Sequence, residues 1–275
     1  MKLQGRIAVV TGASRGVGKG IAVGLGEAGA TVYVTGRTLE GNAHPLGGSI
    51  QETAEAVTRA GGLGIAVRCD HAVDEDVEAL FAQVKAEQGR LDILVNNAFA
   101  VPAGKVYGVP FWELPLSVWD DIHRVGLRSH YVASVFAAPL LLAAGAGQSS
   151  PRLVANVSSF GARVYALNVA YGVGKAGVDR LTSDMAHDFK PHGVASVSLW
   201  PGVVKTERVL RGEFPYNTEG AESPVFTGRA VAALATDLKL MEKTGKPLVV
   251  AELAMEYGFT DIDGSQPKSL REKKR

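Results

Sequence analysis

The chain has little cysteine, little net charge and no long apolar run. Its one cysteine, Cys69, excludes a disulfide framework within the chain and is typical of a reducing compartment. A formal net charge of +1, with charged residues at 21%, argues against a nucleic-acid or membrane surface that works through bulk charge. The first apolar strand begins about five residues after Met1, which leaves no room for a signal peptide, and no apolar run approaches the ~18 residues of a membrane helix. We therefore expect a cytoplasmic protein without nucleic-acid or membrane partners.

What the chain does have is a large apolar content, 46%, and 33 glycines, which suit a fold with many strand-to-helix turns. Apolar strands alternate with helical segments throughout, and this alternation predicts a parallel sheet covered by helices on both faces. We expect one domain over 1–259, with a substrate loop at 205–227 and a polar tail at 260–275 that is frayed at its end. The predicted strands are 7–10, 31–36, 63–69, 91–97, 152–159, 193–200 and 246–250, and the predicted helices after the first are 49–60, 74–88, 117–144, 170–190 and 229–236.

The stretch RIAVVTGASRGVG, from Arg6 to Gly18, reads as a buried strand that breaks into a Gly-rich turn and opens a helix. Glycines let backbone N–H groups approach an anion, and the positive end of the helix dipole points at the turn, so a pyrophosphate fits there. A tight turn without a ligand is the alternative, because the spacing GxxxGxG differs from the usual GxGxxG. The candidate cofactor-binding residues of this turn are Gly12, Ser14, Arg15, Gly16, Val17 and Gly18.

The end of the second strand indicates which dinucleotide would bind. An acid there usually binds the ribose hydroxyls of NAD, whereas an arginine accommodates the 2′-phosphate of NADP. This chain has Gly36, Arg37 and Thr38 at that place, and Arg15 in the first turn could reach the same phosphate. The pattern favours NADP unless both arginines are ordinary surface residues. Asp70, after the third strand, is either an adenine contact or the cap of the next helix.

Two further strand ends carry polar or turn residues at the edge where open α/β sheets bind ligands. Asn96 and Asn97 end the fourth strand, and an amide there could hold a ribose hydroxyl together with the neighbouring backbone, or else form a turn. Asn96 and Ala98 are the cofactor-binding candidates of this strand end. After the sixth strand, the candidates for holding a carboxamide are Pro201, Gly202, Val204 and Thr206, with a plain turn as the alternative.

The strongest chemical pattern is Ser158, Tyr171 and Lys175. Tyr171 and Lys175 are four residues apart on a predicted helix and so share one face. A lysine ammonium and an oxidised nicotinamide would favour the phenolate and lower the tyrosine pKa from its usual value of about 10. Ser158 could then hold a carbonyl oxygen by a hydrogen bond while Tyr171 protonates it. No metal is needed for this chemistry.

In their order and spacing, the motifs TGASRGVG, Asp70, NNA, Ser158, YGVGK and PGVVKT resemble the short-chain dehydrogenase/reductase family over about residues 5–250. Within it, the segments VGLR, SLWPGVVKTE and YGFTDIDG are most similar to the group called dehydrogenase/reductase family member 1. The resemblance implies a doubly wound Rossmann sheet of seven strands and NAD(P)-dependent carbonyl–alcohol chemistry. It also implies Tyr171 as general acid/base, Lys175 as ribose ligand, Ser158 rather than Ser159 as the substrate-orienting serine, and a homodimer or homotetramer built partly on 117–144 and 170–190.

Two residues depart from the family pattern. Phe99 follows Asn96–Asn97–Ala98 where the family has glycine, and it would narrow the nicotinamide pocket or add an apolar wall. Gly126 stands where the family has an asparagine that supports a proton-relay water through its main-chain carbonyl. Because glycine keeps that carbonyl and tolerates a helix kink, we expect the relay to survive through the backbone.

The sequence therefore predicts an NADP(H)-dependent oxidoreductase that transfers hydride between the nicotinamide and a carbonyl or secondary alcohol. The expected direction is reduction, and the expected substrate is a bulky apolar ketone. The expected substrate pocket includes Ser158, Phe99, Phe160 and Tyr165. Two alternatives stay open: an NAD-preferring alcohol dehydrogenase, and a nucleotide-binding sensor that has lost catalysis, which the glycine at position 126 would explain.

Overall fold

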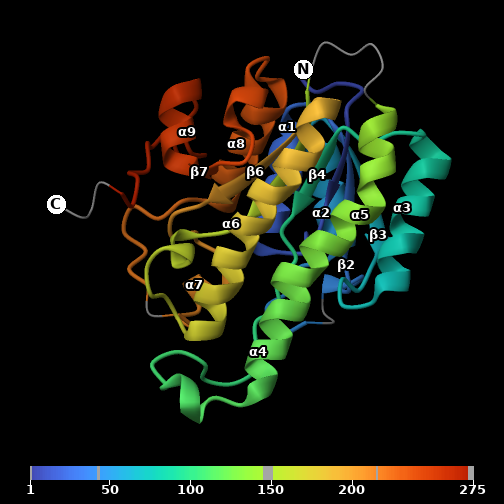
Figure 1. Cartoon of the computed structure of the whole chain (residues 1–275). Coiled ribbons are helices and arrows are strands. Elements are labelled where there is room, and N and C mark those ends of the chain that lie inside the picture. Colours follow the sequence, from blue (N-terminus) through green and yellow to red (C-terminus); the bar gives the residue numbers. More distant parts are fainter. Residues whose placement is uncertain (1, 42–43, 145–150, 215, 272–275) are drawn as a thin grey trace.

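The computed structural model describes residues 2–41, 44–144, 151–214 and 216–271. Its centre is one parallel sheet of seven strands in the order β3-β2-β1-β4-β5-β6-β7 (Figure 1). This confirms the predicted fold class, a doubly wound Rossmann-type sheet. The strands are β1 (Ile7–Val10), β2 (Thr31–Gly36), β3 (Leu63–Arg68), β4 (Ile93–Asn96), β5 (Arg152–Val157), β6 (Val194–Trp200) and β7 (Pro247–Val249).

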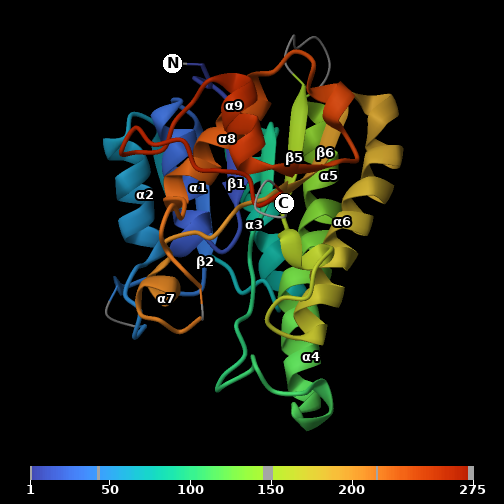
Figure 2. The same cartoon turned by 90° about the vertical axis from the view of Figure 1, so that its left-hand side faces the viewer.

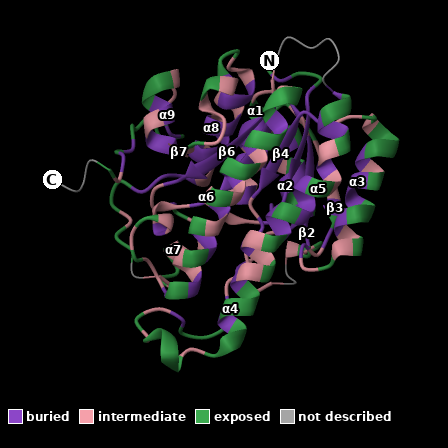
Figure 3. Ribbon diagram, viewed as in Figure 1, coloured by how far each residue is buried: buried purple, intermediate pink, exposed green. Residues whose placement is uncertain are grey.

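Helices cover both faces of the sheet, as Figure 2 shows with the sheet between two layers. One layer holds α1 (Gly16–Glu27), α2 (Ile50–Arg59), α8 (Pro224–Thr236) and α9 (Val250–Tyr257), and the other holds α3 (Asp74–Gln88), α5 (Ser129–Ala143) and α6 (Val169–Phe189). The strand β1 supplies both cores, because Ala8 and Val10 pack with the first layer while Ile7 and Val9 pack with the second. A strand that is apolar at every position is thus buried on both faces, and Figure 3 shows the sheet as the buried centre.

Local signals set several helix ends. Ser49 and Glu52 form a reciprocal capping box at the start of α2. Asn168 caps α6 by accepting the backbone N–H of Tyr171 at 2.9 Å. The helix that carries Tyr171 and Lys175 therefore has a defined first turn.

The predicted helix 117–144 is broken. It consists of α4 (Leu116–His123), a π-helical segment (Arg124–Arg128) and α5, with non-helical dihedrals at Val125 and Gly126. Taken as one unit, Leu116–Ala143 has 28 residues and a mean hydropathy of 1.3 over its most apolar window, enough by length and composition to cross a membrane. Half of that window is buried inside the fold, and a helix of a protein core passes the same test of length and composition. Figure 3 shows α4 largely exposed, extending away from the sheet.

The C-terminal third has more structure than its sequence pattern indicates. The predicted loop 205–227 contains a short helix, α7 (Glu207–Leu210), and the first residues of α8, and α9 follows the last strand. The tail returns over the sheet, where Asp261 accepts the backbone N–H of Ser223 at 2.7 Å and the Arg271 guanidinium lies over the Trp200 ring. The predicted frayed end falls on 272–275, outside the described residues.

Candidate active site

The strand order reverses between β1 and β4, and ligands of such sheets bind where the carboxyl ends of those strands diverge. The Gly-rich turn between β1 and α1 lies there. Gly12 has φ +64, and a Cβ on it would lie 2.7 Å from the Cα of Ala98 in the loop after β4. Only glycine lets the two strand ends approach this closely.

A carboxylate of the protein itself binds to this turn. The backbone N–H of Gly16, the first residue of α1, donates to the Glu207 carboxylate at 2.9 Å. A carboxylate at a helix N-terminus marks a place where unpaired N–H groups and the helix dipole favour negative charge. The turn therefore fits the pyrophosphate of a dinucleotide, with α7 lying over it.

Both arginines of the predicted phosphate site lie near this turn. The Arg15 guanidinium donates to the carbonyl oxygens of Gly47 at 2.8 Å and Gly48 at 2.9 Å, and to the Thr38 hydroxyl at 3.2 Å. Partial burial lowers its pKa from the ordinary arginine value. The Arg37 side chain is 72% exposed and lies 3.9 Å from Asp70. Arg15 is thus fixed by the loop after β2, whereas Arg37 is exposed to solvent beside Asp70.

Asp70 takes the structural role that the sequence left open. Its carboxylate accepts the backbone N–H of Ala72 at 3.0 Å, and its own N–H donates to Asp76 at 2.9 Å. These bonds shape the turn before α3. The side chain remains partly exposed beside Arg37, so an adenine contact stays a prediction.

Asn96, the last residue of β4, and Asn97, the residue after it, connect the strands and loops around the site. Asn96 is fully buried and its amide donates to Ser134 on α5 at 3.0 Å and to Asn156 on β5 at 2.9 Å. The prediction that Asn96 holds a ribose hydroxyl is therefore not supported by its position. Asn97 donates to the carbonyl oxygens of Thr11 and Gly12 and so fixes the Gly-rich turn. Ala98 is anchored by its N–H to the Thr11 hydroxyl at 3.0 Å.

Tyr171 and Lys175 share one face of α6, as their spacing predicts. The Lys175 ammonium is buried and donates to the carbonyl oxygen of Val157, the last residue of β5, at 3.0 Å. It lies 5.8 Å from the centre of the Tyr171 ring. Both side chains therefore stand at the carboxyl edge of the sheet.

The hydroxyl beside Tyr171 belongs to Ser159. The Tyr171 hydroxyl donates to the Ser159 Oγ at 2.9 Å, whereas the Ser158 hydroxyl donates to the Lys175 carbonyl oxygen at 3.1 Å and is buried. The structure thus corrects the expected pairing of Ser158 with Tyr171. Two adjacent serines at a strand end direct their side chains differently, and sequence spacing could not tell which one faces the tyrosine.

The electrostatics also differ from the expectation. Burial raises the pKa of Tyr171 above its ordinary value, and the Ser159 hydrogen bond offsets this only in part. Burial lowers the pKa of Lys175 to about 8, while the Asp179 carboxylate acts in the opposite direction. The predicted acidification of Tyr171 is therefore not a property of the protein groups alone.

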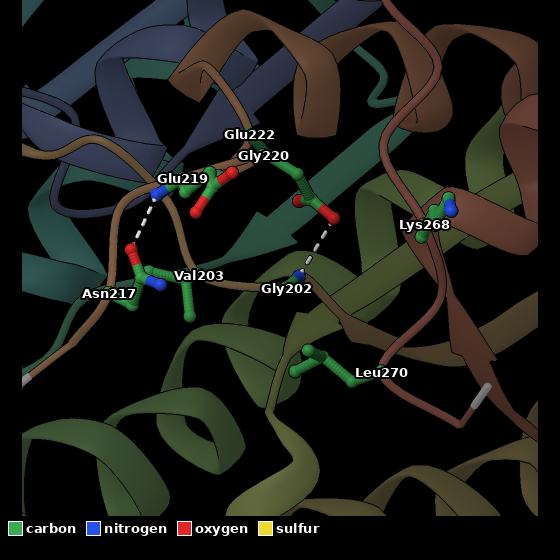
Figure 4. Close-up of a pocket in the computed structure, with 9 residues that line it drawn as sticks. Gly202, Val203, Asn217, Glu219, Gly220, Glu222, Lys268 and Leu270 are labelled. Atoms are coloured by element: carbon green, nitrogen blue, oxygen red, sulfur yellow. Dashed lines mark hydrogen bonds between the residues drawn. The ribbon is translucent and has the colours of Figure 1, made fainter. Parts of the chain in front are cut away.

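The turn after β6 is built around a buried carboxyl. Glu222 accepts the backbone N–H of Gly202 at 2.9 Å, as Figure 4 shows, and its other oxygen has no partner among the described residues. Burial raises the pKa of Glu222 to about 8. The backbone of Glu222 also pairs with the residues that follow Gly202. Its carbonyl oxygen accepts the N–H of Lys205 and its N–H donates to the carbonyl oxygen of Val203, each at 2.8 Å. The carboxyl thus holds the shape of the predicted carboxamide-binding turn.

The remaining predicted residues of this turn lie as follows. Pro201 and Val204 are buried, and Thr206 caps α7 through its hydroxyl. On the Gly-rich turn, Ser14 is buried and Val17 packs against the core below. Gly18 lies where a Cβ would come within 2.4 Å of the Asn97 amide.

The predicted substrate residues separate in space. Phe99 packs edge-on against Tyr171, with ring centres 5.9 Å apart. Phe160 instead packs on Trp200 at 5.0 Å, against the core. Tyr165 is 76% exposed in an open depression of ~390 Å³ with Val169, Val173 and Ala176, on the side of α6 away from Tyr171. The structure therefore brings only Phe99 of these three aromatic residues to the tyrosine.

A second group of aromatic residues was not singled out from the sequence, although two of them, Phe214 and Tyr216, fall in the predicted substrate loop 205–227. Tyr107, Phe214 and Tyr216 pack in a row, with ring centres 5.9 Å apart at each contact. Burial raises the pKa of Tyr216 to about 12, with a smaller contribution from nearby Tyr171. The sequence shows aromatic residues in the segment around Tyr107 and in the segment around Phe214 and Tyr216. It does not show that these two segments, which lie far apart in the chain, pack together.

Comparison with known proteins agrees with this geometry. A profile of the family described as short chain dehydrogenase matches residues 6–211. The chain is 45% identical to Dehydrogenase/reductase SDR family member 1 of Mus musculus, over 97% of this chain and 86% of that protein. It is 44% identical to the Homo sapiens protein of the same name, over 95% and 85%. A metagenomic short-chain oxidoreductase solved in complex with NADP superposes with a TM-score of 0.71 at 29% identity, covering 90% of this chain and 97% of that one. The chain belongs to the short-chain dehydrogenase/reductase family, as an oxidoreductase of its dehydrogenase/reductase member 1 group.

Proposed function

We propose that this enzyme uses NADP(H) and reduces a bulky apolar ketone to a secondary alcohol. The observation that carries the proposal is the Tyr171 hydroxyl, 2.9 Å from the Ser159 hydroxyl and on the same helix face as the buried Lys175 ammonium. Two hydroxyls at this separation can both reach one carbonyl oxygen. The cytoplasmic location and the homo-oligomer remain predictions beside it.

The chain's own groups divide the work. Ser159 donates a hydrogen bond to the substrate carbonyl oxygen, and Tyr171 gives that oxygen a proton. The Lys175 ammonium then stabilises the phenolate that remains, because the lysine is buried and the tyrosine half-buried, so water screens their attraction only weakly. The bound dinucleotide would supply a hydride to the carbonyl carbon. The Gly-rich turn, Arg15, Arg37 and Lys175 would hold it.

The preference for NADP rests on positive charge at the end of β2. Arg15 is anchored with its guanidinium beside Thr38, Arg37 is exposed at the surface, and β2 ends at Gly36 without a carboxylate. Two guanidiniums suit a phosphate dianion, whereas NAD offers only hydroxyls at that place. The solved relative that holds NADP is consistent with this choice.

The preference for an apolar substrate rests on the aromatic residues beside Tyr171. Phe99 lies on one side of its ring, and the row Tyr107, Phe214 and Tyr216 comes from the loops that flank the site. Such walls bind flat or bulky apolar molecules by burying their surface.

The test follows NADPH consumption with a panel of cyclic and aromatic ketones, and compares wild type with Tyr171→Phe. We expect the variant to lose about 10²- to 10⁴-fold in turnover, because the proton donor is gone, while its dissociation constant for NADPH stays unchanged. Equal turnover of both proteins would contradict the proposed mechanism. Tight NADPH binding without turnover of any ketone by wild type would favour the sensor alternative, and a preference for NADH would favour the NAD-dependent dehydrogenase.

A further inference from the structure

The Phe99 ring fills the space that a side chain at position 126 would need. A Cβ built on Gly126 would lie 2.7 Å from the Phe99 Cδ2 and 3.2 Å from its Cε2. Gly126 also has φ +145, a conformation that strongly favours glycine. The two departures from the family pattern, a large residue at 99 and none at 126, are therefore one packing arrangement.

The backbone around this contact is fixed on both sides of Phe99. The N–H of Ala100 donates to the carbonyl oxygen of Val125 at 2.8 Å. On the other side, the Ala98 carbonyl oxygen lies 3.3 Å from the His130 Nε2. The loop after β4 is thus joined to the kink between α4 and α5 at the residue before and the residue after Phe99. The position of the ring follows from these two attachments.

From this position the ring contacts both groups of the catalytic pair. It meets the Tyr171 ring at an angle of 88°, the edge-to-face arrangement that aromatic pairs favour. The Lys175 Nζ lies over the Phe99 ring, 4.9 Å from its centre. An ammonium at this distance is attracted by the negative face of the ring.

The buried ammonium has few other groups to stabilise its charge. Its hydrogen bond goes to the Val157 carbonyl oxygen. Among the described residues, the charged or titratable groups near it are Asp179 on α6, Tyr171 beside it and His130 on α5. Burial holds His130 neutral, with a pKa of about 3, so it adds no charge at neutral pH. The ring face therefore adds to the attraction of Asp179 and the Val157 carbonyl.

We propose that Phe99 is a positioning residue of the reaction, which packs at a right angle against the Tyr171 ring and holds the Lys175 ammonium over its face, and that Gly126 is glycine to make room for it. The role rests on the proposed function of Tyr171 and Lys175. The contact itself does not, so it can be tested independently of turnover.

The first experiment is a double-mutant cycle on stability with Phe99→Leu and Lys175→Met. Leucine keeps an apolar side chain of similar size but removes the ring face, and methionine removes the charge. We expect a coupling of about 3- to 30-fold in the unfolding equilibrium constant at pH 7, and none at pH 10, where the lysine is neutral in the wild type. The matched control is Phe81→Leu, at a buried phenylalanine on α3, which should show no coupling with Lys175→Met. Coupling no larger than the control's would overturn the proposal.

The second experiment measures the pH profile of alcohol oxidation with NADP and cyclohexanol. Without the ring, the ammonium is less stable and supports the phenolate less well, so Phe99→Leu should move the acidic midpoint up by roughly 0.4 to 1.5 pH units. Phe81→Leu should leave the acidic midpoint unchanged. If Phe99→Leu gave the same pH profile as Phe81→Leu, the proposal would also be overturned. The unfolding cycle decides the contact even if cyclohexanol is not turned over, which separates this inference from the proposed function.

A third measurement tests the fit of the two residues. Gly126→Ala should destabilise the wild type, because its methyl group meets the ring, and should cost clearly less in a Phe99→Ala background. Additive effects would contradict the packing part of the proposal.

Discussion

At the scale of single residues, Ser158 and Ser159 bind different atoms of the same helix, and this decides what each can do. Ser159 reaches the Tyr171 hydroxyl and Ser158 reaches the Lys175 carbonyl oxygen. Ser159→Ala should lower kcat by about 10²- to 10³-fold, as the loss of one donor to a developing oxyanion does. Ser158→Ala should cost about 1 kcal/mol of unfolding free energy with a much smaller loss of kcat. Steady-state kinetics and denaturant unfolding of both variants check this, and the reverse ranking in kcat would restore Ser158.

Glu222 makes the stability of the protein depend on pH. Its pKa is about 8 in the folded protein against 4.5 for an ordinary glutamate, so the folded state binds the extra proton between these values. The free energy of unfolding should therefore fall as pH rises through this window, by up to about 1.4 kcal/mol per pH unit from this group.

The variant Glu222→Gln should remove that dependence, because an amide oxygen can still accept the Gly202 N–H. Denaturant unfolding from pH 5 to pH 9 measures the unfolding free energy of both proteins. The stability of the variant relative to the wild type should increase as pH rises. A constant difference between the two proteins over this range would show that Glu222 does not titrate there.

At the scale of the elements, α1 and α8 approach so closely that Gly24 and Gly228 leave no room for a Cβ between them. A Cβ on Gly24 would lie 2.6 Å from the carbonyl carbon of Gly228. Gly24→Ala should push the helices apart and lower the unfolding free energy by about 3 kcal/mol or more, although alanine is the better helix former. On α6, a Cβ on Gly172 would meet only the Gly161 oxygen, at 3.5 Å, so Gly172→Ala should hold or raise stability. Thermal unfolding compares the two, and equal midpoints would contradict the close contact.

At the scale of the whole molecule, the family resemblance predicts an oligomer built on α5 and α6. Both helices carry exposed apolar side chains, among them Tyr131 and Val135 on α5 and Val173 on α6. Val173→Asp should shift the protein toward the monomer in size-exclusion chromatography with light scattering, because a carboxylate would be buried in the contact. Leu238→Asp, at an exposed position after α8, serves as the control. A wild type that is monomeric at micromolar concentration would contradict the prediction.

The sequence by itself determined the parallel sheet, the Gly-rich turn, and the pairing of Tyr171 with Lys175. Each depends on a local period or spacing: continuous apolar runs for buried strands, a four-residue interval for one helix face. The sequence predicted one helix over 117–144 in which Gly126 would tolerate a kink, and the break itself appears only in the structure. The Phe99 ring that fills it comes from a loop after β4.

Only the tertiary structure decided which serine faces Tyr171, that Asn96 is buried in a polar network, and that Glu207 lies on the Gly-rich turn. Burial raises the pKa of Tyr171 in the protein alone, an effect that cannot be read from its neighbours in the chain, so the predicted lowering depends on the bound nicotinamide. These features arise between residues far apart in the sequence, where contact depends on how the helices and loops pack. That packing is not encoded in any one local pattern.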